Sequence, residues 1–148
     1  MIEADGELCA CGQRGCLETV LGGAQLTSRL TRLGTDLARL DGDPRPVAAA
    51  EADRIVTALA SAVTLVVVTY DSAAVVLGGG ILRGADWLRP RLEDELRGRA
   101  FGSPFLAGLA VADRLVELPD EIPVAAIGAA VVGRKKELRA RAEHLVGG

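Results

Sequence analysis

The chain has few aromatic side chains, one histidine, and no cysteine outside residues 9–16. It also lacks an excess of positive charge, because its formal net charge at pH 7 is −3 over 148 residues. Nucleic acid is bound by basic surfaces, so a part that reads DNA would have to lie outside this chain. Unpaired cysteines and the lack of a signal peptide predict a cytoplasmic protein.

Because cysteine is absent elsewhere, the cluster near the N-terminus is informative. Cys9, Cys11 and Cys16 have the spacing C-x-C-x4-C. Clustered thiols without partners indicate a metal site rather than a disulfide framework. Zinc favours thiolates in a tight loop, and Gly12 and Gly15 would let the backbone turn the sulfurs inward. Free thiols remain an alternative, whereas redox activity is disfavoured because C-x-C is not the C-x-x-C spacing.

The cluster supplies three ligands, and a closed zinc site takes four. An oxygen from Asp5, from Glu7 or from water could complete the site. The single histidine, His144, lies in a charged segment near the C-terminus, and we expect it to be solvated.

Hydrophobic periodicity, with glycine and proline as boundary signals, predicts an α/β fold. We expect helices over residues 17–33 (broken at Gly22-Gly23), 47–68, 85–99 and 124–144. Short apolar runs predict strands over residues 73–77 and 109–118, and residues 41–46 form a loop. The alternation favours helices packed on a sheet. Residues 1–18 would be the zinc-binding loop, and residues 19–148 a single α/β lobe.

The uncharged run at residues 55–70 could be mistaken for a membrane span. A spanning helix usually needs about 20 apolar residues, and this run is shorter and contains threonine and serine. We therefore predict a buried core helix and no association with a membrane.

Gly78, Gly79 and Gly80 follow a predicted strand and precede a helical pattern. Ligands of α/β folds bind at the carboxyl ends of strands, where glycine lets the backbone approach closely. The triplet is neither a P-loop nor a G-x-G-x-x-G fingerprint, so a plain tight turn and the edge of a nucleotide site both remain open. The small side chains at residues 125–130 predict close packing of the last helix on the sheet.

The segment C-A-C-G-Q-R-G-C-L-E at residues 9–18 resembles the cysteine signature of the ROK family, which comprises repressors, open reading frames and sugar kinases. The segment V-V-L-G-G-G-I-L at residues 75–82 is similar to the glycine motif of that family. Residues 125–130 resemble the start of its C-terminal helix. The resemblance implies the C-terminal lobe of an actin-like, ribonuclease-H-type ATPase fold, and it implies that this chain is only the C-terminal portion of such a protein.

The resemblance also implies roles for particular residues. Three cysteines and a histidine hold zinc in the family, and that histidine would fall just before Met1. The glutamate that ends the signature, here Glu18, holds sugar hydroxyls; an ordinary first-turn helix carboxylate is the alternative. Kinases of the family carry a D-x-G-x-T segment and a catalytic aspartate, which this chain lacks, so we expect no phosphoryl transfer by the chain alone.

Two functions follow from the resemblance. The first is the zinc-containing sugar-sensing and dimerisation part of a ROK-type transcriptional regulator, which would bind a small sugar or sugar phosphate, form a homo-oligomer, and reach DNA only through a domain outside this chain. The second is the C-terminal lobe of a glucokinase-like sugar kinase, inactive alone, in which Gly78–Gly80 would border ATP and Mg²⁺. Kinases of the family tend to follow the signature with a Ser-Gly turn, whereas residues 19–23 here contain no serine, and Leu17-Glu18-Thr19 resembles the repressor members, so the resemblance favours the regulator. A truncated reading frame without activity is a third possibility.

Overall fold

The structure of the protein is a computed structural model that describes residues 3–78, 85–116 and 126–134. The chain divides into two units, Met1–Glu117 and Leu118–Gly148. In the second unit, residues 126–134 are helical, which confirms that part of the helix expected over 124–144. The remainder of that predicted helix, with His144, lies outside the described residues.

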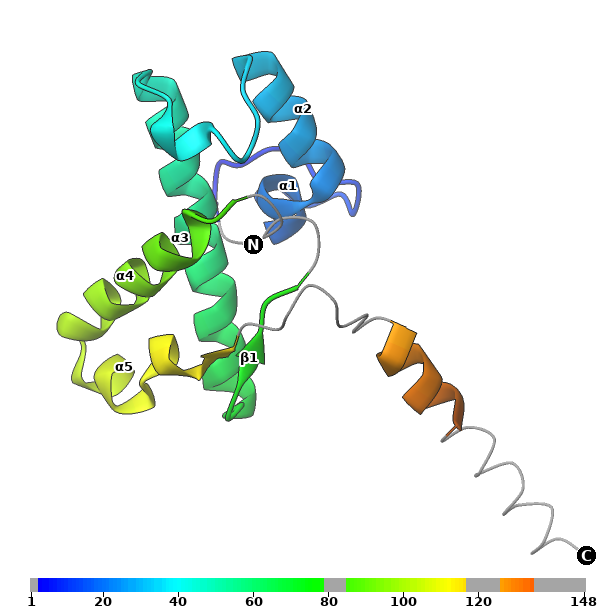
Figure 1. The fold of residues 1–148 in the computed structure, drawn as a ribbon, viewed down its shortest axis with the longest axis vertical. Helices are drawn as coiled ribbons and strands as arrows, with labels where there is room; N and C mark the ends of the chain where they lie inside the picture. Colours follow the sequence, from blue (N-terminus) through cyan, green and yellow to red (C-terminus); the bar gives the residue numbers. More distant parts are fainter. Residues whose placement is uncertain (1–2, 79–84, 117–125, 135–148) are drawn as a thin grey trace, which may run out of the picture. The chain divides into compact units, whose positions relative to one another are not determined.

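Helix α3 (Pro46–Tyr70) is the element around which the first unit is built (Figure 1). Pro46 stands at its first position, where a missing N–H costs no hydrogen bond. The helix therefore covers the expected 47–68 and extends slightly beyond it at both ends. Most of its buried residues recur every three or four positions, as expected of a helix packed mainly on one side; they are Ala48, Ala52, Ile55, Val56, Ala58, Ala60, Val63 and Val67.

Two short helices pack near the beginning of α3. They are α1 (Leu17–Leu21) and α2 (Gly23–Leu33), separated at Gly22, so the expected break at the glycine pair is confirmed. The 3₁₀ turn η1 (Leu40–Gly42) lies in the loop that precedes α3. Together these elements enclose the first core cluster, whose buried residues are Leu26, Leu30, Leu40, Ala48, Ala52, Ile55, Val56, Ala85 and Leu88.

The second half of α3 packs against α4 (Leu88–Phe101) and the 3₁₀ turn η2 (Val111–Arg114), and α5 (Pro104–Leu109) packs on α4. Helix α4 confirms the amphipathic helix expected over 85–99, because Leu88, Leu92 and Leu96 are its buried residues. The second core cluster comprises Ala60, Val63, Val67, Leu92, Leu96, Val111 and Leu115.

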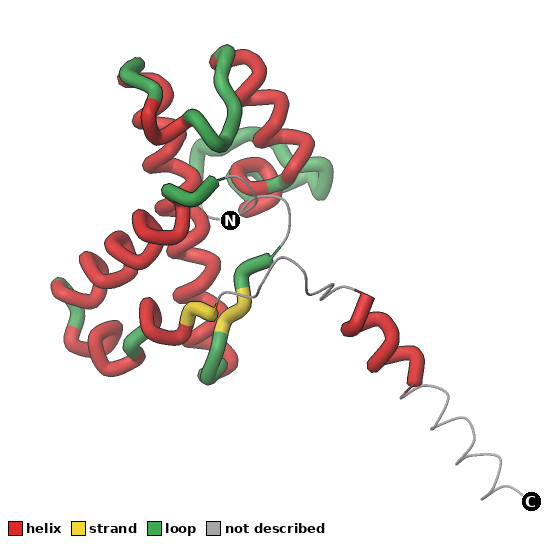
Figure 2. Tube along the Cα trace, viewed as in Figure 1, coloured by secondary structure: helices red, strands yellow, loops and turns green. Residues whose placement is uncertain are grey.

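The sheet is smaller than the sequence predicts. In the described residues it consists of two parallel strands, β1 (Val75–Val76) and β2 (Leu115–Val116), with Val75 opposite Leu115. The fold is accordingly mostly helical with one small parallel sheet, rather than helices layered on an extended sheet (Figure 2).

The strand expected over residues 109–118 is wrong for its first half. Ser103 and Pro104 start α5, because the Ser103 Oγ accepts a hydrogen bond from the Leu106 N–H at 3.3 Å. Ala110 then ends the helix in the left-handed conformation, with φ of 47°, and η2 follows. Of the described residues in this stretch, Leu115 and Val116 pair with β1, and residues 117–118 of the predicted strand lie outside the part of the chain that the structure describes. Hydrophobicity alone does not distinguish this packed turn from a strand.

Helix α3 is long and apolar enough to cross a membrane by length and composition, and among the described residues it is the one helix with this property. We keep the core-helix interpretation, because α3 contributes buried residues to both core clusters, but the expected burial does not extend over the last turns, where Leu65, Val66 and Val68 are exposed. A polar contact also reaches its middle: the Arg99 guanidinium of α4 donates to the Ser61 Oγ and to the Thr57 carbonyl, each at 3.1 Å.

Candidate metal centre

The first two cysteines lie on a narrow hairpin turn. Leu8 and Arg14 form an antiparallel bridge. Inside it, the Cys9 N–H donates to the Gln13 carbonyl at 2.7 Å and the Gly12 N–H donates to the Cys9 carbonyl at 2.9 Å. This turn brings Cys9 and Cys11 to the same end of the loop.

The three thiols converge. The sulfur atoms of Cys9, Cys11 and Cys16 all lie within 4.8 Å of one another, and the Sγ atoms of Cys11 and Cys16 are 3.5 Å apart. Tetrahedral zinc with bonds of about 2.3 Å would hold its sulfur ligands roughly 3.8 Å apart. The spread of the three sulfurs fits such an ion, so the residues present could hold a metal. The spacing prediction is borne out in this coarser form.

The thiols influence one another electrostatically. Hydrogen bonding, first from the Gln13 backbone and then from Cys16, lowers the pKa of the Cys11 thiol. The hydrogen bond with Cys11, burial and the neighbouring Cys9 raise the pKa of Cys16 to about 11. Cys11 therefore loses its proton before Cys16, and a second thiolate beside the first is disfavoured by charge repulsion. A bound cation would offset this repulsion, so metal binding would release protons.

Gly15 brings the base of the loop together. It has a φ of 63°, and a Cβ atom at this position would lie 1.7 Å from the Glu3 carbonyl oxygen. Glycine is therefore needed both for the backbone conformation and for the close approach of the two segments. The next residue is Cys16, so the contact between Gly15 and Glu3 also positions the backbone that carries the third thiol.

The group formed by the three cysteines contains no carboxylate among the described residues. Asp5 and Glu7, which the sequence offered as oxygen ligands, are outside it. The Glu7 carboxylate instead lies 4.0 Å from the Arg54 guanidinium. His144 lies outside the described residues, so its exposure to solvent stays a prediction. The histidine ligand expected just before Met1 also stays a prediction.

Glu18 lies in the first turn of α1, one residue beyond Leu17 and the metal loop. Its side chain is exposed and folds back over Gly22. A Cβ atom at Gly22 would lie 2.4 Å from the Glu18 Oε1 atom and 2.3 Å from the Glu18 carbonyl oxygen. Because Gly22 has no side chain, the Glu18 carboxylate can occupy this space.

Of the glycine triplet, Gly78 is described, and Gly79 and Gly80 lie outside the described residues. Gly78 is exposed after β1, and a Cβ atom there would meet nothing within 4 Å. Its neighbour Leu77 packs against the second core cluster. The metal loop is tied to the other half of α3, at Arg54 beside the first cluster. The cysteine loop and Gly78 therefore lie beside different halves of α3.

Sequence reasoning missed four charged residues that hold the loop on the helices. The Arg29 Nε donates to Glu51 at 2.8 Å, and the Arg54 Nε and Nη2 donate to the two Glu3 oxygens at 2.7 and 2.8 Å. Hydrogen bonding by Arg54 lowers the pKa of Glu3. The available signal was the group of charged residues Glu51, Asp53 and Arg54 in the first half of α3, whose second half carries no charge.

The fold and the site together define a mostly helical domain with a loop of three converging cysteines at its N-terminus. The sequence pattern of the ROK family matches residues 1–136. The chain therefore belongs to the ROK family. No curated protein and no solved structure matches it.

Proposed function

We propose that Cys9, Cys11 and Cys16 hold a structural zinc ion. Thiolates are soft ligands, which favour zinc over Mg²⁺ or Ca²⁺. The convergence of the sulfurs within 4.8 Å supports the proposal. The ion would stabilise the loop and leave one tetrahedral position for a further ligand, such as water or a residue beyond those described.

We further propose that the chain is the sugar-sensing and dimerisation part of a ROK-type transcriptional regulator. The observation that carries this proposal is the position of Glu18, an exposed carboxylate in the first turn of α1, two positions after Cys16. A metal-bound Cys16 would hold α1 in place, and with it an acceptor for the hydroxyls of a small sugar or sugar phosphate.

The other parts of the proposal concern partners and location. The net charge of −3 supports DNA binding only through a domain outside this chain. Exposed apolar residues on the second half of α3, among them Leu65 and Val68, support self-association. Three unpaired thiols support a reducing, cytoplasmic location.

Calorimetric titration of the zinc-loaded chain with glucose, other hexoses and their phosphates tests the sugar-sensing proposal. We expect one of these ligands to bind, and Glu18→Gln to weaken its affinity at least about tenfold, because hydrogen bonds to a charged acceptor are strong. Asp94→Asn, which removes an exposed carboxylate from α4, is the matched control. Equal affinity of Glu18→Gln and wild type would rule out this role of Glu18.

The alternative is the C-terminal lobe of an ATP-dependent sugar kinase. The observation that favours it is the open space around Gly78 after the carboxyl end of a parallel strand. Binding of ATP and Mg²⁺ by this chain, lost in Gly78→Leu, would support the kinase lobe. Sugar binding and dimerisation without ATP binding would support the regulator.

A further inference from the structure

Cys16 is held by the body of the domain on both of its sides. On the upstream side, the Glu3 N–H donates to the carbonyl of the buried Gly15 at 3.3 Å. On the downstream side, the Cys16 carbonyl accepts from the Thr19 N–H at 3.0 Å and from the Thr19 hydroxyl at 2.7 Å. Thr19 is 2% exposed, so this second support is part of the core.

Both supports lead to charged side chains. Upstream, Glu3 is gripped by the guanidinium of Arg54 on α3 through two hydrogen bonds of 2.7 and 2.8 Å. Downstream, the Arg29 guanidinium of α2 donates to the carbonyls of Thr19 and Val20 at the end of α1. A planar guanidinium with paired donors fixes orientation as well as distance.

Glu51 joins the two arginines. Its Oε1 atom accepts from the Arg29 Nε at 2.8 Å, and its Oε2 atom lies 3.7 Å from the Arg54 Nη1. The side chains of Arg29 and Glu51 are only 7% and 11% exposed. Charge interactions at such a shielded position are stronger than at an open surface, so one carboxylate on α3 can hold both supports.

Cys9 and Cys11 have a different setting. The backbone hydrogen bonds around them are local to the hairpin, from Cys9 to Gln13 and from Gly12 to Cys9. Cys11 is exposed, whereas Cys9 and Cys16 are both partly exposed, so the contrast between the hairpin and Cys16 lies in their hydrogen bonds. The hairpin can therefore adjust its position, whereas Cys16 is tied to three helices.

We propose that Glu51, acting through Arg29 and Arg54, is a positioning residue that fixes Cys16 as the preset ligand of the metal site. The hairpin bearing Cys9 and Cys11 then closes onto a sulfur that is already in place. Presetting one ligand reduces the ordering that metal binding requires. This inference rests on the proposed metal site and adds residues far from the cysteines in sequence to it.

Titration of the full metal-free chain with Co²⁺, a spectroscopic substitute for zinc, tests the inference. Thiolate-to-cobalt charge-transfer absorption per bound ion reports how many sulfurs bind, and chelator competition gives the affinity. We expect Glu51→Gln and Glu3→Gln to weaken Co²⁺ binding about 10- to 100-fold. The charge-transfer absorption should fall because Cys16 no longer stays within reach, a change that a general loss of stability would not produce.

Asp43→Asn is the matched control, because it also removes a carboxylate that pairs with an arginine, Arg45, away from the loop. It should leave affinity and spectrum unchanged. Should circular dichroism find Glu51→Gln unfolded, Glu3→Gln decides the question, because the Glu3 side chain is 29% exposed. If folded Glu3→Gln has wild-type affinity and absorption, the inference is overturned and the proposed metal site stands. Absence of cobalt absorption in the wild-type chain would overturn the metal site and the inference together.

Discussion

At the scale of single residues, the glycines around the metal loop are needed for different steric reasons. Gly15 makes room for the Glu3 carbonyl, and Gly22 makes room for the Glu18 carboxylate. Gly23 differs from them, because a Cβ atom there would meet nothing within 4 Å, whereas Gly12 has open space but a φ of 87° that favours glycine. Gly22 and Gly23 therefore form a matched pair that separates a steric need for glycine from glycine content.

Gly22→Ala should destabilise the protein by about 1–3 kcal/mol, because the new methyl group must displace the Glu18 carbonyl and carboxylate. Gly23→Ala, at the first position of α2, should be neutral or stabilising by less than about 1 kcal/mol, since alanine favours helix. Urea unfolding followed by circular dichroism measures both. Equal midpoints for the two variants would contradict the placement of Glu18 over Gly22.

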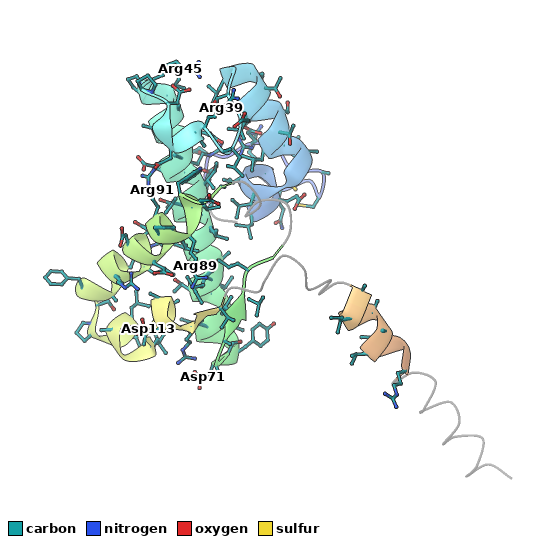
Figure 3. All side chains as sticks on the ribbon, viewed as in Figure 1. Arg39, Arg45, Asp71, Arg89, Arg91 and Asp113 are labelled. Carbon is teal, nitrogen blue, oxygen red and sulfur yellow. The ribbon has the colours of Figure 1, made fainter. Side chains whose placement is uncertain are left out.

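At the scale of elements, the junction between α2 and α3 is made by a charged pair. Asp43 accepts hydrogen bonds from the Arg45 backbone N–H at 3.0 Å and from its guanidinium Nε at 2.9 Å. Arg45 also donates to the Leu33 carbonyl, at the end of α2, at 2.6 Å. Figure 3 labels Arg45 near one end of α3 and Asp71 near the other. The Asp43–Arg45 pair therefore fixes the direction in which α3 leaves the loop.

The same pair predicts a pH dependence. Hydrogen bonding by Arg45 lowers the pKa of Asp43 from 3.8 to about 2, so its contribution to stability is present above about pH 4 and is lost as the pH falls toward 2. The difference in urea midpoint between wild type and Asp43→Asn should therefore be constant from pH 5 to 7 and shrink below about pH 4. Asp94→Asn is the control for loss of one exposed charge. A difference that persists unchanged to pH 2 would refute the assignment.

The elements also indicate which patterns in the sequence were informative. The amphipathic spacing of Leu88, Leu92 and Leu96 gave α4 correctly, because every fourth residue faces the same side of a helix. The apolar run at residues 109–118 predicted the strand at Leu115–Val116 but not the helix end and the 3₁₀ turn that precede it. Its conformation depends on the left-handed Ala110 and on the Arg114 guanidinium, which donates to the Leu109 carbonyl at 2.9 Å. Neither feature can be read from hydrophobicity, which was the signal behind the predicted strand.

At the scale of the whole molecule, α3 joins two core clusters, and the metal loop is fastened to the first through Arg54. Loss of the metal would therefore loosen the N-terminal loop and α1 first, because the second cluster makes no use of them. The proposed ion acts as a cross-link between the start of the chain and the core.

Removal of zinc should lower the melting temperature. An ion present at 100 times its dissociation constant stabilises the folded state by about 2.7 kcal/mol, which corresponds to roughly 5–10 °C for a domain of this size. Cys16→Ser should melt at the temperature of the chelated wild type and should not respond to chelator. Scanning calorimetry with and without a strong chelator measures both effects. A wild-type melting temperature unaffected by chelation would show that the loop carries no structural zinc.

The sequence by itself determined the local features of this protein: the cysteine cluster, the break at Gly22-Gly23, and the helices α3 and α4. Each depends on residue type and spacing along a short stretch of chain, which suffices for thiol chemistry and helical periodicity. Only the tertiary structure decided that the sheet is so small, and that Glu51 lies between Arg29 and Arg54. Such contacts join residues distant in sequence, and their partners are selected by packing and shielding from water, which no local pattern encodes.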